Sequence, residues 1–246
     1  MLDLIGKMVR LLTTQRAVGQ SLGDAFRNGY SIASTEIIHN ICQYTTEILT
    51  VIDVGANQGQ FAIASARGFQ KATIYSFEPL PDVYPVLQKN VSTYPQIKSF
   101  NMALGSSNGV IDFYRNSHSH ASSALPISTY QQTQLPETAN TEKIQVSVQR
   151  LDQVRSELTL TRPVLLKLDV QGYEKEVLEG ASAMLDQVDY LVFETSFVPM
   201  YEGEPVFNEM HEYVKSKGFE LIVPVGSLQN KTGQYLQLDV LYGRKS

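Results

Sequence analysis

The chain has 246 residues, a formal net charge of −5 and a single cysteine, and apolar residues make up 43 % of it. This composition supports a sizeable core and excludes wholesale disorder, and the length suits one large α/β domain or a domain with a small extra lobe. Basic residues are scattered rather than clustered, so we expect no nucleic-acid partner, and Cys42 alone excludes an internal disulfide and a thiolate metal cluster.

Residues 1–50 are expected to form an N-terminal helical extension, because they contain no long alternating segment. Residues 1–12 lack the apolar core and cleavage site of a signal peptide, and their apolar side chains recur at helical spacing. This spacing favours a helix that packs on the domain over one that lies on a membrane surface. No run approaches the roughly 20 apolar residues that span a bilayer. We therefore expect a cytoplasmic protein with no membrane span.

From residue 51 to residue 246 we expect one domain, in which short apolar runs alternate with helical periods. This rhythm is typical of a parallel sheet covered by helices on both faces. The predicted helices span 60–67, 81–91, 173–181 and 206–217. The predicted strands span 48–54, 72–77, 97–102, 110–114, 143–148, 164–169, 190–194, 219–223 and 235–241. The last two flank a turn at 226–233, so we expect a mostly parallel sheet with an antiparallel C-terminal strand.

Residues 115–142 are polar and too long for an ordinary connection, which predicts a lid-like insertion. His118 and His120 lie within it. Exposed loop histidines are usually idle, and a catalytic role for these two stays an alternative. His39 and His211 lie in helical stretches, where a structural role is expected.

The loop after the first strand reads Asp53-Val54-Gly55-Ala56-Asn57-Gln58-Gly59, and it lies where an open parallel sheet binds ligands. Gly55 permits close backbone approach, and Gly59 lets the next helix begin close to a ligand. Asn57 stands where the dinucleotide fingerprint has its second glycine, which disfavours a pyrophosphate. The carboxylate of Asp53 would repel phosphate and attract an ammonium group. The loop therefore predicts a ligand with a cationic amino-acid end rather than NAD.

Glu78 follows the second predicted strand, about 20 residues beyond the glycine loop, as ribose recognition requires. Its carboxylate is placed to accept hydrogen bonds from both ribose hydroxyls. The alternative is a surface acid at the end of a strand. The glycine loop upstream favours the ribose role.

Lys167 and Asp169 share one face of the strand at 164–169, because side chains alternate along a strand. A lysine inside a buried strand is costly unless it is paired, so Asp169 is its expected partner. The pair is either a structural ion pair or part of the reactive centre at the carboxyl end of the strand.

The glycine loop, the ribose acid and the alternating sheet together resemble a class I S-adenosylmethionine-dependent methyltransferase of Rossmann-like fold. Residues 165–174, Leu-Leu-Lys-Leu-Asp-Val-Gln-Gly-Tyr-Glu, and the following 177–181, Val-Leu-Glu-Gly-Ala, resemble the K-x-D-x-x-G-x-E…L-x-G pattern of the FkbM family. Residues 77–79 and 101–105 also match that family's pattern. The resemblance covers roughly 51–194 and implies S-adenosylmethionine as the cofactor.

The resemblance also implies the residues of the site. The cofactor would contact Asp53, Gly55, Ala56, Asn57, Gly59, Glu78, Asn101, Ala103 and Asp169. The catalytic residues would be Lys167, Asp169 and Glu194. Thr195-Ser196 follow Glu194 where the family often has a histidine, which weakens a histidine-assisted mechanism there. Glu174 begins a helix, and the helix dipole alone accounts for it.

The resemblance implies an O-methyltransferase that acts on a hydroxyl or carboxylate of a small molecule, a sugar or a peptide-derived metabolite. An alcohol acceptor would need a general base, and Asp169 or Lys167 is best placed. No third ligand accompanies Asp169 and Glu194, so we expect no metal. A nucleotide-dependent oxidoreductase and a catalytically silent binding module stay as alternatives. Cys42 precedes the sheet, so methylation through a cysteine adduct is not expected, and the oligomeric state stays open.

Overall fold

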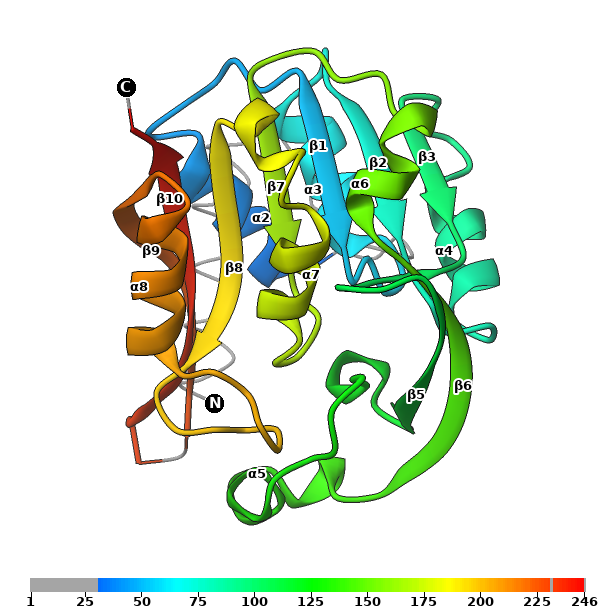
Figure 1. Cartoon of the computed structure of the whole chain (residues 1–246), viewed down its shortest axis with the longest axis vertical. Coiled ribbons are helices and arrows are strands. Elements are labelled where there is room, and N and C mark those ends of the chain that lie inside the picture. Colours follow the sequence, from blue (N-terminus) through cyan, green and yellow to red (C-terminus); the bar gives the residue numbers. More distant parts are fainter. Residues whose placement is uncertain (1–30, 231, 246) are drawn as a thin grey trace, which may run out of the picture.

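In the computed structural model, which describes residues 31–230 and 232–245, seven strands form a central sheet in the order β3-β2-β1-β7-β8-β10-β9 (Figure 1). The strands are β1 Thr50–Val54, β2 Thr73–Phe77, β3 Ile97–Phe100, β7 Val164–Leu168, β8 Tyr190–Ser196, β9 Phe219–Gln229 and β10 Tyr235–Arg244. Neighbouring strands from β3 to β8 pair in parallel, and β10 runs antiparallel to both β8 and β9. The predicted fold class is confirmed.

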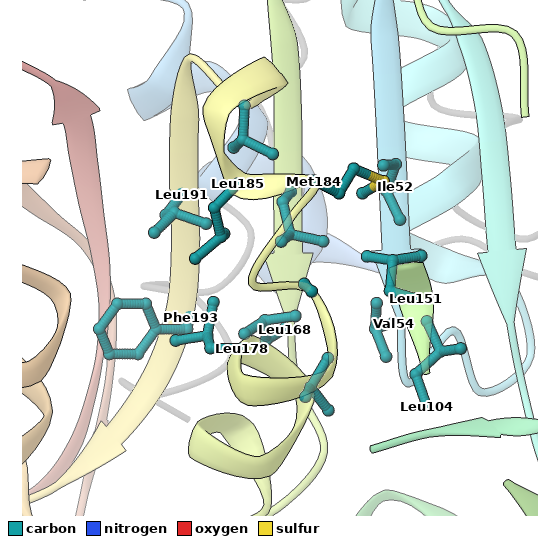
Figure 2. Close-up of a cluster of buried hydrophobic side chains, with 14 of the residues drawn as sticks. Ile52, Val54, Leu104, Leu151, Leu168, Leu178, Met184, Leu185, Leu191 and Phe193 are labelled. Carbon is teal, nitrogen blue, oxygen red and sulfur yellow. The ribbon is translucent and has the colours of Figure 1, made fainter. Parts of the chain in front are cut away.

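Helices cover both faces of this sheet. On one face lie α2 (Ile32–Ile41), α3 (Gln60–Gly68) and α4 (Tyr84–Val91), and on the other α6 (Leu151–Val154), α7 (Glu174–Gly180) and α8 (Phe207–Ser216). Side chains alternate along each strand, so Val51 and Leu165 face the first layer while Ile52 and Leu166 face the second. Figure 2 shows the second layer, where side chains of β1, β7 and β8 meet Leu178 of α7. Strands buried on both faces must be apolar throughout, which makes the charged residues within them conspicuous.

A second sheet of three strands stands beside the first, in the order β4-β6-β5. Its strands are β4 Ala103–Leu104, β5 Gly109–Asn116 and β6 Thr141–Gln149. Between β5 and β6 lie the short helices η2 (Ser119–Ala121), α5 (Thr129–Gln134) and η3 (Pro136–Thr138); η4 (Arg155–Glu157) and η5 (Leu185–Gln187) follow later in the chain. In Figure 1 the insertion, drawn in green, projects past the carboxyl ends of β1 and β7. It therefore faces the edge of the sheet where ligands are expected.

Of the expected N-terminal helices, the structure describes α2, and residues 1–30 lie outside the described residues. The hydroxyl of Ser31 caps α2 by accepting the backbone N–H of Ser34 at 3.2 Å. Asn40 ties the other end to the sheet by donating to the carbonyl of Val225 in β9 at 2.8 Å. Among the helices described, none has the length and apolar character needed to cross a membrane.

Candidate active site

The glycine loop after β1 is shaped by a close approach to the loop after β7. Gly55 has φ +78°, and a Cβ there would lie 1.9 Å from the carbonyl oxygen of Asp169. Only glycine fits such a position. The N–H groups of Gly55 and Ala56 both donate to the carbonyl of Phe77 in β2, at 3.1 and 2.9 Å. The loop is thus fixed between the strands on either side of β1.

Glu78 joins the loops after β1 and β2. One carboxylate oxygen accepts the backbone N–H of Asn57 at 2.9 Å and the other accepts that of Leu80 at 2.8 Å. Burial raises the pKa of Glu78 to about 7, against the opposing effect of the two N–H groups. Asn101 braces the same turn by donating to the carbonyls of Glu78 and Pro79 at 2.9 and 3.2 Å. Each oxygen of Glu78 keeps a lone pair free for another donor.

A cavity of about 230 Å³ opens above these loops. Its polar wall includes Gly55, Asn57, Glu78 and Asp169. Its apolar wall includes Phe77, Leu80, Met102, Ala103, Ile111 and Phe113. A flat aromatic base fits the apolar wall, and a ribose and a charged amino-acid group fit the polar one.

Four of the predicted cofactor residues stand behind this cavity rather than in its wall, namely Asp53, Ala56, Gly59 and Asn101. Gly59 begins α3 at φ +90°, and a Cβ there would lie 2.8 Å from a methyl of Leu87 in α4. Gly59 therefore fits a packing requirement between two helices, and the geometry gives it no direct contact with a ligand.

Asp53 and Lys167 are register partners on the adjacent strands β1 and β7. The ammonium of Lys167 lies 3.1 Å from Asp53 and 3.4 Å from Asp169, and it donates to the carbonyl of Gly55 at 3.2 Å. Burial disfavours the charge on Lys167, but Asp53 and Asp169 outweigh burial and raise its pKa above the ordinary value. The predicted pairing with Asp169 is present, and Asp53 is a second partner.

This pairing changes two of the expected roles. Asp53 is fully buried against Lys167, so its carboxylate does not face the cavity where an ammonium group would bind. The side chain of Asp169 is 41 % exposed and lines the cavity, which makes it the better partner for such a group. The raised pKa favours the protonated form of Lys167 and so disfavours Lys167 as the general base.

Gln171 links two carboxylates at the carboxyl ends of β7 and β8. Its amide nitrogen donates to Asp169 at 2.8 Å and to Glu194 at 2.9 Å. Glu194 also accepts a hydrogen bond from Gln237 of β10 at 2.8 Å. Burial and then the charge of Asp169 raise the pKa of Glu194 well above its ordinary value. Gln171 adopts φ +59°, which is rare for a residue other than glycine and is found at functional sites.

Sequence reasoning missed the role of Gln171 and the loop that supports it. The hydroxyl of Tyr201 donates to the amide oxygen of Gln171 at 2.7 Å. Glu204 orders the loop that carries Tyr201 by accepting the N–H groups of Met200 and Tyr201 at 2.6 and 3.0 Å. Gln171 lies inside the K-x-D-x-x-G-x-E pattern, but no local sequence pattern marks Tyr201 or Glu204.

A second cavity, of about 260 Å³, adjoins the first. Both are lined by His120, Gln171 and Glu194, so Glu194 stands at their junction. The insertion supplies much of the wall of the second cavity, including His118.

His211 contacts the hydroxyl of Tyr242 at 2.9 Å, on the helical face away from both cavities, which agrees with a structural role. Within residues 31–230 and 232–245, no group of three histidine, cysteine or acidic side chains is placed to hold a metal ion.

Three features define the class I S-adenosylmethionine-dependent methyltransferase fold. These are the strand order, the single antiparallel strand β10 and a ligand cavity above β1 and β7. The fold is similar to that of magnesium protoporphyrin IX methyltransferase (ChlM) from Synechocystis PCC 6803 with bound SAH, with a TM-score of 0.51 and 11 % identity over 95 % of this chain and 94 % of that one. The model of the methyltransferase FkbM domain matches residues 53–221, and the chain belongs to that family.

The chain is also similar in sequence to two named methyltransferases. The 2-O-methyltransferase NoeI of Sinorhizobium fredii is 27 % identical over 180 residues, which cover 70 % of this chain and 72 % of NoeI. The hexuronic acid methyltransferase AglP of Haloferax volcanii is 26 % identical over 176 residues, which cover 71 % of this chain and 67 % of AglP. The protein is an S-adenosylmethionine-dependent methyltransferase.

Proposed function

We propose that the protein transfers a methyl group from S-adenosylmethionine to a hydroxyl oxygen of a small molecule or sugar. The observation that carries this proposal is the position of Glu194, a desolvated carboxylate at the junction of two adjoining cavities. A base at that point reaches an acceptor in one cavity beside a methyl donor in the other. The name of NoeI, a 2-O-methyltransferase, agrees with an oxygen acceptor, and the name of AglP, a hexuronic acid methyltransferase, agrees with a sugar-derived acceptor.

The first cavity fits the cofactor part by part. Glu78 would accept the ribose hydroxyls, Asp169 would pair with the ammonium of the methionine end, and Leu80 and Phe113 would cover the adenine ring. When bound, the cofactor supplies an activated methyl group on a sulfonium centre. The chain then has to position the acceptor in line with that methyl and exclude water. The role of residues 115–142 as a lid stays a prediction.

Glu194 is proposed as the general base that takes the proton from the acceptor hydroxyl. A raised pKa makes the ionised form of a carboxyl group a stronger base, and proton transfer to that form contributes about 10²- to 10⁴-fold in rate. Gln171 holds Glu194 at a fixed distance from Asp169. Lys167 offsets part of the negative charge from behind the site.

The acidic side chains at this site favour a hydroxyl acceptor over a carboxylate acceptor. Burial and the neighbouring Asp169 raise the pKa of Asp239 to about 7, and Asp239 lies opposite Glu194 on the paired strand β10. In their ionised forms, Asp169 and Glu194 repel an anionic acceptor bound beside them. A neutral hydroxyl meets no such repulsion.

Transfer of labelled methyl from S-adenosylmethionine to matched alcohols and carboxylic acids tests the proposal. We expect base-stable ether products, identified by NMR. Glu194→Gln should lower kcat by about 10²- to 10⁴-fold with unchanged affinity for S-adenosylhomocysteine. Glu202→Gln, an exposed acid on the neighbouring loop, is the control and should behave as wild type. Ester products from carboxylic acids, or a fully active Glu194→Gln, would overturn the proposal.

A further inference from the structure

Gln131 is a buried amide in the insertion, and it borders the second cavity. It lies on α5, where the hydroxyl of Ser128 caps the helix by accepting the N–H of Gln131 at 3.2 Å. Its amide nitrogen contacts the hydroxyl oxygens of Thr138 at 3.1 Å and Tyr201 at 3.5 Å. The side chain is 2 % exposed, so nearly all of it is out of contact with water.

The orientation of this amide is fixed by its neighbours. The Thr138 hydroxyl already donates to the carbonyl of Leu135 at 2.9 Å. The Tyr201 hydroxyl donates to Gln171 at 2.7 Å, the shorter of its two contacts as a donor. Each hydroxyl has one proton, so both can offer Gln131 only a lone pair. The NH₂ group must therefore face them, and the amide oxygen faces away.

That oxygen has no hydrogen-bond partner among the described residues. A buried acceptor without a partner is unfavourable, and such groups in folded proteins call for an explanation. Since Gln131 lines the second cavity, a molecule bound there can supply the missing donor.

We propose that the second cavity holds the methyl acceptor and that the amide oxygen of Gln131 accepts a hydrogen bond from a second, non-reacting O–H or N–H group of that acceptor. The inference rests on the proposed function, because Glu194 must receive the reacting hydroxyl. It makes Gln131 a specificity-determining residue. The acceptor then carries at least two donor groups, one for Glu194 and one for Gln131.

The rest of the second cavity suits a polyhydroxylated ring. Leu135, Met200 and Leu228 offer apolar surface for ring carbons, and Gln237 and Thr138 are neutral polar groups. A site built to hydrogen-bond a hydroxyl discriminates strongly against an analogue that lacks it, because the buried polar group is then left without a partner. Gln131 should therefore select against acceptors with one hydroxyl.

The test uses methyl glycosides of the gluco, galacto and manno series, their monodeoxy analogues and cyclohexanol as probes. Initial rates of labelled methyl transfer give kcat and KM, and calorimetry with protein saturated in S-adenosylhomocysteine gives probe affinity. Gln131→Leu should raise KM for the best glycoside roughly tenfold and weaken its binding equally, with little change in kcat. One monodeoxy analogue of that glycoside should bind to wild type about as weakly as the glycoside itself binds to Gln131→Leu. Its affinity should not fall further in Gln131→Leu.

One control variant separates recognition from structure. Gln132→Leu alters an exposed neighbour on the same helix and should behave as wild type. Unchanged KM in Gln131→Leu, an equal loss in Gln132→Leu, or cyclohexanol used as well as the glycosides would overturn the inference and leave the methyl-transfer proposal standing. Absence of transfer to every hydroxyl probe, with S-adenosylhomocysteine still bound, would overturn both.

Discussion

The ammonium of Lys167 lies 3.1 Å from the carboxylate of Asp53, and both side chains are buried between β7 and β1. Replacing one member of a buried pair leaves the other charge without compensation, at a cost of about 3 to 5 kcal/mol. Lys167→Met should therefore lower the free energy of unfolding by that amount, as measured in urea. Adding Asp53→Asn should recover part of the loss. A free energy of unfolding of Lys167→Met within about 1 kcal/mol of the wild-type value would contradict the buried ion pair.

Gly55 and Gly203 provide a matched test of the close approach between the loops after β1 and β7. Their φ values are +78° and +80°, but a Cβ on Gly203 meets nothing within 4 Å whereas one on Gly55 meets the Asp169 carbonyl. Gly203→Ala should cost only the left-handed strain of about 1 to 2 kcal/mol. Gly55→Ala should cost more and abolish binding of S-adenosylhomocysteine by calorimetry. Equal behaviour of the two variants would show that the loops are free to separate.

Glu78→Gln tests the proposed ribose contact. Glutamine keeps one acceptor oxygen but turns an NH₂ group toward the N–H of Asn57 or Leu80, so both the loop and the contact weaken. We expect affinity for S-adenosylhomocysteine to fall about 10- to 100-fold, as for loss of a charged hydrogen bond. Asp82→Asn, four residues further on and paired with Arg115 at the surface, should bind normally. Wild-type affinity in Glu78→Gln would remove Glu78 from the cofactor site.

The stability of the protein should depend on the ionisation of Glu174. Burial raises the pKa of Glu174 to about 8 from its ordinary value of 4.5. Between these values the folded protein holds a proton that the unfolded chain has released, so the free energy of unfolding falls as the pH rises. Glu174→Gln cannot ionise, yet its amide oxygen can still accept the N–H of Val170. Between pH 5 and pH 8, the free energy of unfolding in urea should decrease less for the variant than for wild type. An equal decrease in both proteins would contradict the raised pKa of Glu174.

The sequence allowed the glycine loop, Glu78 and the Lys167–Asp169 pair to be predicted, because each depends on a short contiguous pattern. The pairing of Lys167 with Asp53 was not foreseen, since it depends on the register between β1 and β7, more than 110 residues apart. Asp53 was consequently expected to bind a ligand, and the structure buries it instead. Composition and spacing carry no information on register.

The loops and strand ends were harder to predict than the sheet. Tyr201 contacts both Gln131 and Gln171, and only tertiary packing brings these three residues together from segments far apart in the chain. The strands β9 and β10 run further than expected, to Gln229 and Arg244. Pro224 and Gly226 interrupt the alternating pattern in β9, and irregularities in its register with β10 accommodate them.

The hydrogen bonds from Gln131 through Tyr201 and Gln171 to Glu194 all point the same way, each group donating toward the carboxylate. A proton taken up by Glu194 cannot return along this series, because the Gln171 amide already directs its N–H groups at both carboxylates and has no acidic proton to exchange. Under the proposed mechanism, the proton that Glu194 takes from an acceptor leaves through the cavities rather than along this series. Glu194 then loses that proton to water that enters the cavities between one acceptor and the next.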